Sequence, residues 1–583
     1  MSGDVLTLFG IKDSERIKAE QIGSFWSTWS SENDEYTNTM NEVQEYIQAI
    51  DTSDTSNEDS GWNNSTHIPK LTQIRDILYA NYQTGLFPNE QWLRWEGDNE
   101  AAEESKKREA IQGYMTNKVR NPEFRNVVNG LLLDYIDYGN AYATAEYVKY
   151  TREDMDGNEE TIFEGPVPRR ISPLDIVFNP VATTWADTPV IVRASMTEGD
   201  LKKLALDSTD VDFIAKIEQV LDIRTKAKSG HYSDADSDLM REIQLSGLGN
   251  LHAYLTGNIV EVLTFYGNYY DTETGELMIN QKIMIADRMF LLEDTSNPSW
   301  VGKPIMHVGW RKRPGNLLGM SVLENLIGMQ YRLNHLENMK ADALDLNVYP
   351  PFKIKGNVPE FTYAPRSQIH IPDLDGSDVE ALAPDLSAMS LDIEIQQLMD
   401  WMEEFAGAPK QTMGFRTPGE KTAFEVQQLM TSAGRVFQEK ITNFEVQLLE
   451  PLLNLMLSEA RNGLTGSDLA RVASDLAEAT TFTEITSTDI RASGKLRPVG
   501  ARHFSEQAQL LKNLVGIMSS PLGPKLLPHM SGKDLYTILE NAMGIEKWQL
   551  FSENAGIQEM ADQQKLAREA QGRNNQVAGT EIE

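Results

Sequence analysis

Apolar side chains recur at alternating steps of four and three residues between positions 322 and 343. A mean spacing of about 3.5 residues is typical of a helix whose apolar seam packs in coiled-coil fashion. Ser321 and Glu324 form a capping-box pattern at its start, and Pro350 follows its end. We therefore expect one helix of about 26 residues, roughly 39 Å long. Its seam comprises Val322, Leu326, Met329, Leu333, Leu336 and Ala343, with an interruption at Lys340.

A second, polar series on the same stretch advances by four residues at a time and consists of Gln330, Asn334, Asn338 and Asp342. Residues four apart lie on one face of a helix, so these side chains form a stripe beside the apolar seam. We expect the helix to pack against neighbouring elements along the seam and to be hydrated along the stripe.

The 3.5-residue spacing returns in a second helix, which is opened by Ser390 and Asp392 and ended by Gly407. Between the two helices, residues 350–384 hold short strand candidates at 352–355, 368–371 and 379–382, separated by Pro and Gly. We expect a small mixed unit there. The seam of the second helix comprises Leu391, Ile395, Leu398, Met402 and Phe405.

The chain before these helices changes from polar sequence to helices and then to strands. Up to about residue 69 it is polar and acidic, with a low-complexity loop at 51–61. Helical spacing predicts helices at 69–82, at 103–119 and from 122 to 139. Period-two alternation predicts strands, and Thr197 caps a helix among them. The strands are expected at 141–150, 161–164, within 171–180, and at 188–193, 260–270, 277–287 and 289–292.

Residues 408–420 contain two Pro and two Gly and are expected to form a loop. Thr417 and Glu420 then form a capping box with Pro418 at the first helical position. The helix that follows should run to about residue 461 with a kink near Pro451. A strand at 480–492, helices between 501 and 552, and a polar tail from 558 complete an α+β fold. The loop and the first turn of its helix carry Lys410, Gln411, Arg416 and Lys421.

Composition narrows the functions open to a chain of this length. The 583 residues are too many for a single compact domain. Lys and Arg number 53 against 87 Asp and Glu, so the formal charge of -34 argues against a protein that wraps DNA by neutralising phosphates. The absence of cysteine excludes disulfides and thiolate sites and fits a reducing cytoplasm. We find no signal peptide and no apolar stretch long enough for a membrane span.

Motifs for catalysis are missing from the sequence. The eight histidines are scattered, without an HExxH pattern. There is no GxxxxGK[ST] loop for an ATPase and no GxSxG elbow. We therefore expect neither an enzyme nor a bound cofactor or metal. Because carboxylates are abundant, a carboxylate-based metal-dependent hydrolase is kept as the alternative.

Residues 309–338 resemble the stem-helix signature of bacteriophage portal proteins, the head-to-tail connectors. Residues 171–180 and 188–193 resemble a wing segment of the same family, and the order of helix, small mixed unit and helix resembles its stem, clip and stem. The likeness covers most of the chain and is strongest at 171–180 and 309–451. The stem signature rests on Trp310, Arg313, Pro314, Gly319, Met320, Ser321, Leu326, Met329, Gln330, Asn334 and Asn338.

The resemblance implies a division of the chain into portal regions. Residues 1–308 would form the wing, with 1–68 polar and partly flexible. Residues 309–349 would be the stem helix, 350–388 the clip and 389–407 the second stem helix. A tunnel loop at 408–420 would lead into a tunnel helix and wing return at 421–500. Residues 501–583 would form a helical crown with a polar C-terminal tail.

Family membership implies a ring, taken as a dodecamer, at one capsid vertex, assembled in the host cytoplasm and carried in the virion. Double-stranded DNA would pass through its channel, past Lys410, Gln411, Arg416 and Lys421. Further partners would be the terminase large subunit, the head-tail adaptor, the major capsid protein and the scaffold. Asp373 and Asp375 would contribute to docking at the clip. A mostly acidic wall would hold DNA loosely enough to let it slide.

Overall fold

The structure is a computed structural model of the chain. It falls into two compact units, Met1–Thr84 with Trp95–Arg497, and Gly85–Arg94 with Pro498–Glu583. The residues described are 12–48, 64, 66–87, 92–99, 105–153, 159–208, 210–229, 257–271, 275–296, 303–348, 350–356, 358, 360, 376, 378–382, 390–407, 439–473 and 480–498. The antiparallel sheets and separate helices of the first unit confirm the α+β class.

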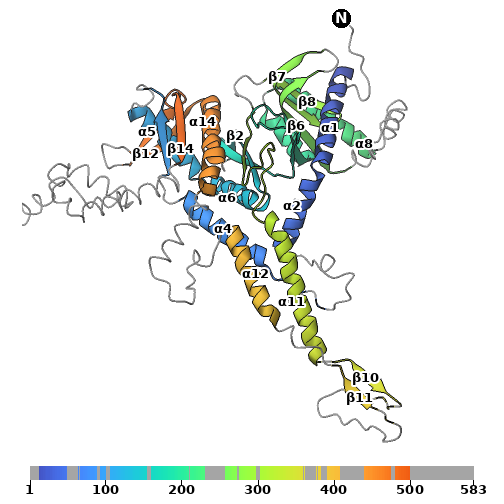
Figure 1. Cartoon of the computed structure of the whole chain (residues 1–583). Coiled ribbons are helices and arrows are strands. Elements are labelled where there is room, and N and C mark those ends of the chain that lie inside the picture. The colour runs from blue at the N-terminus through green and yellow to red at the C-terminus, as the bar shows by residue number, and fades with distance from the viewer. Residues whose placement is uncertain are drawn as a thin grey trace, which may run out of the picture. The chain divides into compact units, whose positions relative to one another are not determined.

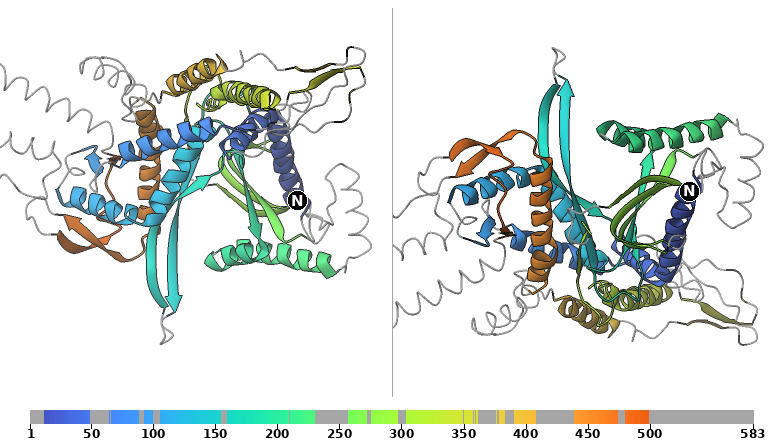
Figure 2. Two further views of the ribbon diagram at one scale, coloured as in Figure 1. Left: turned by 90° about the horizontal axis from the view of Figure 1, so that it is seen from below. Right: turned by 90° about the horizontal axis from the view of Figure 1, so that it is seen from above.

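A five-stranded antiparallel sheet in the order β4-β5-β6-β7-β8 lies between helices. Alternate residues of β6 point to opposite faces. Leu263 and Phe265 pack with Ile22 and Trp26 of α1 (Asp13–Glu32), whereas Val260 and Val262 pack against α7 and α8. Figure 2 shows α1 and α8 on either side of the sheet. The elements are β4 (Ile176–Phe178), β5 (Val190–Thr197), α7 (Glu198–Asp207), α8 (Val211–Ser229), β6 (Ile259–Tyr270), β7 (Leu277–Ala286) and β8 (Phe290–Ser296).

These strands confirm those expected between residues 171 and 292, and Thr197 caps α7 in a full capping box with Asp200. β2 (Asn140–Glu153) and β3 (Glu159–Ile171) form a hairpin that confirms the strands predicted at 141–150 and 161–164, and this hairpin is the long ribbon in Figure 2. The first residues of β2 pair with β9 (Met306–Gly309). The predicted helices at 103–119 and 122–139 are α5 (Ser105–Val119) and α6 (Pro122–Asp137).

The predicted kink near Pro451 takes the form of a π-helical turn, Glu445–Leu449, immediately before α14 (Glu450–Gly463). Proline has no N–H to donate to the carbonyl four residues earlier, so a wider turn at this point relieves the helix. β12 (Ser467–Ala473) pairs with β13 (Thr480–Thr486), which ends earlier than the predicted strand at 480–492. β1 (Leu93–Gly97) pairs with β14 (Gly494–Pro498).

Two helices in the polar N-terminal stretch have no counterpart in the sequence prediction. α1 and α2 (Asp34–Ile47) bury Ile22, Trp26, Met40 and Val43. Their apolar residues do recur at steps of three and four, but serine, asparagine and acidic residues fill the remaining positions and lower the mean apolar content. The low-complexity loop at 51–61 lies outside the described residues.

The two seamed helices are α11 (Ile327–Val348) and α12 (Leu391–Ala406), which lie side by side in Figure 1. Before α11 comes a 3₁₀ turn, Glu324–Leu326, so the regular helix is 22 residues long and begins later than expected. Half of the predicted capping box forms: the Ser321 N–H donates to Glu324 Oε2 at 3.3 Å. The other half shifts, because the Ser321 hydroxyl accepts from Leu323 rather than Glu324.

Between these helices, β10 (Phe352–Lys355) pairs with β11 (Asp378–Ala381), which confirms two of the three strand candidates. The third, at 368–371, lies outside the described residues. Gly407 ends α12 in the left-handed conformation, with φ of 71°. α4 (Lys70–Leu86) is the predicted helix at 69–82. None of the described helices combines the length and apolar character needed to span a bilayer.

Candidate assembly surface on the paired helices

The predicted apolar seams of α11 and α12 are buried within the chain, with one exception. Met329 and Leu391 are partly buried. Phe405 is 64% exposed, so it is not covered by the same chain. The buried face of α12 instead continues to Ala406, which lies closer to the direction of Met402 around the helix. Fully buried members of the two seams are Val322, Leu326, Leu333, Leu336, Ile395, Leu398 and Met402.

Two ion pairs hold α11 beside α12. Arg332 Nη2 lies 3.1 Å from Glu394 Oε1, and Lys340 Nζ lies 2.6 Å from Asp392 Oδ1. Lys340 donates a hydrogen bond to Asp392, and this bond raises the pKa of Lys340. Lys340, which interrupts the apolar series of α11, therefore contacts the partner helix by its charge. Because both pairs are partly exposed, each contributes little to stability.

The polar stripe of α11 is buried, in contrast to the hydrated stripe expected from the sequence. An extended segment, residues 66–69 together with Asn64, runs along it and is called the strap here. Backbone N–H groups of the strap and of the start of α4 donate to the side-chain oxygens of the stripe. The donor-to-acceptor pairs are Asn64 to Asp342 at 3.1 Å, Thr66 to Asn338 at 2.7 Å, Ile68 to Asn334 at 3.2 Å and Leu71 to Gln330 at 3.2 Å.

The strap and the helix match because their repeats have nearly the same length. Four residues of helix advance about 6.0 Å, and two residues of extended chain advance about 6.6 Å. Every second residue of the strap therefore meets every fourth residue of α11, with the two chains antiparallel. The strap satisfies the amide oxygens of Gln330, Asn334 and Asn338 and Oδ1 of Asp342, which would otherwise be buried without partners, whereas Asp342 Oδ2 stays buried without one. A buried ion pair between Lys70 of α4 and Glu403 of α12 lies beyond its end.

Replacing Gln330 with leucine should destabilise this arrangement. Gln330 is fully buried, accepts from the Leu71 N–H and donates to the Ile68 carbonyl at 2.6 Å. Leucine would leave the Leu71 N–H buried without a partner, so we expect a loss of about 2 to 3 kcal/mol in the free energy of unfolding. Denaturant unfolding measures it. Gln397→Leu, on the exposed face of α12, is the matched control and should change stability by less than about 0.5 kcal/mol.

Gly319 and Ser321 of the signature pack closely against Gly139, Asn140 and Gly309, and these five residues are called the helix root. Asn140 Nδ2 donates to the Gly319 carbonyl at 3.0 Å, and Asn140 Oδ1 accepts from the Gly319 N–H at 2.8 Å. The Ser321 hydroxyl donates to the Ile136 carbonyl at 2.7 Å. A Cβ on Gly319 would lie 2.6 Å from the Gly139 oxygen and 2.8 Å from Gly309 Cα. These contacts fix where the paired helices leave the sheet and α6.

Trp310 completes the root with aromatic contacts. Its ring centroid lies 5.4 Å from that of Tyr82 and 4.9 Å from that of Tyr135. The Trp310 carbonyl accepts from Lys440, in the helical segment that leads to the π turn. The signature around Trp310 and Gly319 therefore serves to join three distant parts of the chain.

The face of α12 that turns away from the seam carries large apolar side chains in contact with solvent. Trp401 is 52% exposed, and Ile393 and Phe405 are more exposed still. Trp401 and Phe405 are four residues apart and so lie next to each other on the helix surface. We call Ile393, Trp401 and Phe405 the α12 apolar row. Sequence reasoning missed Trp401, although its position four residues before Phe405 was the available signal.

The remaining predicted site residues lie outside the described residues. These are Lys410, Gln411, Arg416 and Lys421 of the channel loop and Asp373 and Asp375 of the clip. Among the residues that the structure does describe, no three histidine, cysteine or acidic side chains gather as ligands for a metal.

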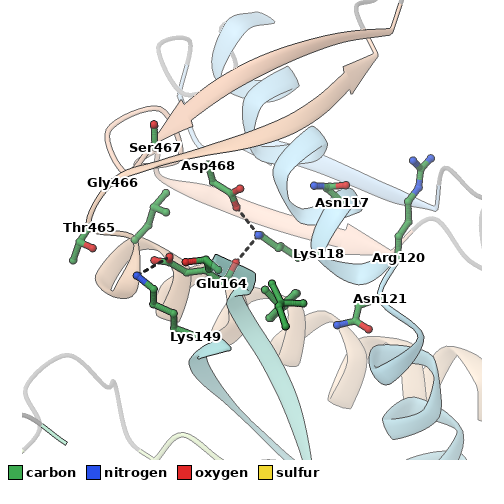
Figure 3. A pocket seen from close by; sticks show the side chains of 14 residues that line it. Asn117, Lys118, Arg120, Asn121, Lys149, Glu164, Thr465, Gly466, Ser467 and Asp468 are labelled. Atoms are coloured by element: carbon green, nitrogen blue, oxygen red, sulfur yellow. Dashed lines mark hydrogen bonds and ion pairs between the residues drawn. The ribbon is translucent and has the colours of Figure 1, made fainter. Parts of the chain in front are cut away.

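A cavity of about 700 Å³ lies among α5, the β2–β3 hairpin and β12 (Figure 3). Four of its charged groups, Lys118, Lys149, Glu164 and Asp468, pair with each other. Lys118 contacts Asp468 and donates to the Glu164 carbonyl, and Lys149 Nζ lies 3.5 Å from Glu164 Oε2. Tyr147 also donates to Glu164. The arrangement joins three elements and leaves these charges occupied by one another.

Comparison of the sequence with protein-family models and with curated proteins found no match.

Proposed function

We propose that this chain is a phage portal protein, one subunit of a ring at a single capsid vertex through which double-stranded DNA is packaged and ejected. The ring would also be the docking platform for the terminase large subunit and the head-tail adaptor, and it would contact the major capsid protein and the scaffold. Its role would be structural rather than enzymatic. The resemblance of residues 309–338 to the portal stem supports the proposal, as does the presence of two paired helices around a small β unit.

The observation that carries the proposal is the α12 apolar row. The adjoining face of α12 is already covered by the same chain, through Ile395, Leu398 and Met402. Exposed aromatic side chains on a helix of this kind are expected to be covered by another protein surface. In a portal, a second copy of the chain would supply that surface. A heterologous contact, in which two different surfaces of the subunit meet, would repeat from copy to copy until a ring closes.

The charge of the chain also favours a channel over a DNA-wrapping surface. With a formal charge of -34, the assembled ring would repel DNA over most of its surface. A few cations on the channel loop would then provide weak, salt-screened contacts that steady the duplex without holding it. The assignment of Lys410 and Arg416 to this role rests on the resemblance of the loop at 408–420 to the portal tunnel loop.

Charge reversal at the channel loop tests this function. Lys410→Glu with Arg416→Glu should still form rings and enter procapsids, but the particles should hold shorter DNA or lose it after packaging. Pulsed-field gel electrophoresis of DNA from purified particles measures the length. Lys202→Glu with Lys203→Glu makes the same charge change at exposed positions of α7 and should leave DNA length unchanged. Full-length DNA in the channel-loop variant would count against the assignment.

A further inference from the structure

The hydrogen bonds between the strap and α11 have a fixed direction, because a backbone N–H can only donate. The Leu71 N–H donates to Gln330, which must therefore present its oxygen there and its amide nitrogen on the other side. Gln330 Nε2 in turn donates to Asn334 Oδ1 at 2.9 Å, and the Ile68 N–H donates to the same oxygen. Both backbone donors thus determine the orientation of the Asn334 amide.

That orientation determines the state of His67. With its oxygen occupied by two donors, Asn334 turns its Nδ2 toward His67 Nδ1 at 2.9 Å. An amide nitrogen has hydrogens to donate and no lone pair to accept. His67 Nδ1 must therefore be an unprotonated acceptor, so the imidazole is neutral and carries its proton on Nε2. The doubly protonated imidazolium would set two donors against each other at this contact.

We propose that the strap is an acid-released latch: uptake of a proton by His67 breaks the contact with Asn334 and frees the strap from α11. Turning the Asn334 amide over would not rescue the latch, because its nitrogen would then face the Ile68 N–H and Gln330 Nε2. The free-energy cost of protonating His67 therefore affects every hydrogen bond from Asn334 through Gln330 to the Leu71 N–H. This device stands independently of the proposed portal function, since it depends only on contacts within one chain.

The groups around His67 do not offset the added charge. The Tyr46 ring of α2 stacks on the imidazole, with centroids 6.0 Å apart. Lys70 of α4 and Glu403 of α12 pair with each other and so present no net charge. On α11, Asp342 is two steps farther along the stripe; Asn64 occupies its Oδ1, and its Oδ2 has no hydrogen-bond partner. Burial lowers the pKa of His67, whose Nε2 has no hydrogen-bond partner, and the nearby Tyr46 backbone offsets part of that effect.

The direction of the pH effect follows from linkage. Because the pKa is lowered in the latched state, the released state binds more protons, and the latch is most stable above the ordinary histidine pKa of about 6.5. Latching weakens as the pH falls from about 6.5 toward the lowered pKa of the latched state. The latching equilibrium should fall by up to about tenfold for each pH unit in this range.

Hydrogen exchange of the full chain tests the latch. The Thr66, Ile68 and Leu71 amides should be protected at pH 7.5, and after correction for intrinsic exchange their protection should fall several-fold at pH 5.5. His67→Gln keeps an acceptor for Asn334 but cannot titrate, so its protection should be equal at both pH values. His335→Gln is the control: it removes a histidine of α11, which stacks on Tyr331, and should behave like the wild type.

A second variant reverses the sign of the effect. In Asn334→Asp, one carboxylate oxygen can still accept from Ile68 and Gln330, while the other can accept from a protonated His67. Protection of the strap should then rise, not fall, between pH 7.5 and pH 5.5. Wild-type protection that is the same at both pH values would overturn the latch, as would an equal loss in His67→Gln. A fall in Asn334→Asp as large as that in the wild type would also overturn it.

Discussion

Replacing Trp401 and Phe405 with aspartate should abolish assembly of the chain while leaving the subunit folded. Both side chains are more than half exposed in the chain, so they contribute little to its own core. Covering them at a contact between copies would stabilise that contact by about 2 kcal/mol each, whereas a charge there would have to be desolvated. The summed change, about 4 kcal/mol, lowers each contact's equilibrium constant about a thousandfold.

Mass photometry and thermal unfolding together measure this result. The double variant should appear as single subunits, with an unfolding temperature close to that of wild-type subunits that have been dissociated. Gln396→Asp adds a charge to an exposed position of α12 outside the apolar row and should still assemble. Leu333→Asp should differ from the Trp401 and Phe405 variant. Leu333 is fully buried within the chain, so this substitution should lower the yield of folded protein and also prevent assembly. Normal assembly of the Trp401 and Phe405 variant would remove the α12 apolar row from the contact.

Gly319→Ala should unfold or strongly destabilise the chain, although it adds a single methyl group. The added Cβ would lie 2.6 Å from the Gly139 carbonyl oxygen and 2.8 Å from Gly309 Cα, and both are backbone atoms that cannot rotate away. Separating these segments would also break the two hydrogen bonds between Asn140 and Gly319. We expect a loss of at least about 4 kcal/mol in the free energy of unfolding.

Gly328→Ala is the control for this prediction. Gly328 is exposed in α11, and a Cβ there would meet nothing within 4 Å. Alanine in a helix is more favourable than glycine by about 0.5 to 1 kcal/mol, so this variant should be slightly more stable than the wild type. Opposite signs for two Gly→Ala changes nine residues apart would locate the effect in the helix root. A Gly319 variant as stable as the wild type would show that the three glycines are not in close contact.

Local periodicity predicted the helices and strands whose apolar residues are dense. The seams of α11 and α12 and the strands β5 to β8 follow directly from steps of 3.5 and two residues. α1 and α2 have the same periodicity but too few apolar residues to stand out, and in α1 the sheet supplies most of the apolar surface of the contact. Phe405 was placed in the seam because a 3.5-residue step does not distinguish it from Ala406, which is buried.

The burial of the polar stripe could not be predicted from α11 alone. Its partner, the strap, is more than 260 residues away in the sequence, and neither segment has a pattern that names the other. A stripe of amides at four-residue steps looks like a solvated helix face until an extended segment of matching repeat is found. The role of His67 follows only from the direction of several hydrogen bonds that meet at Asn334. Long-range pairing, rather than local propensity, therefore determines both the helix root and the latch.

Electron microscopy of the purified full-length protein tests the portal proposal most directly. Negative-stain images followed by class averaging should show closed rings of one subunit number, seen end-on with a central channel wide enough for a DNA duplex. Mass photometry of the same sample should give a single large species whose mass is a whole multiple of 65.6 kDa. Subunits that remain monomeric or dimeric at every concentration, or that form open filaments without a channel, would contradict the account.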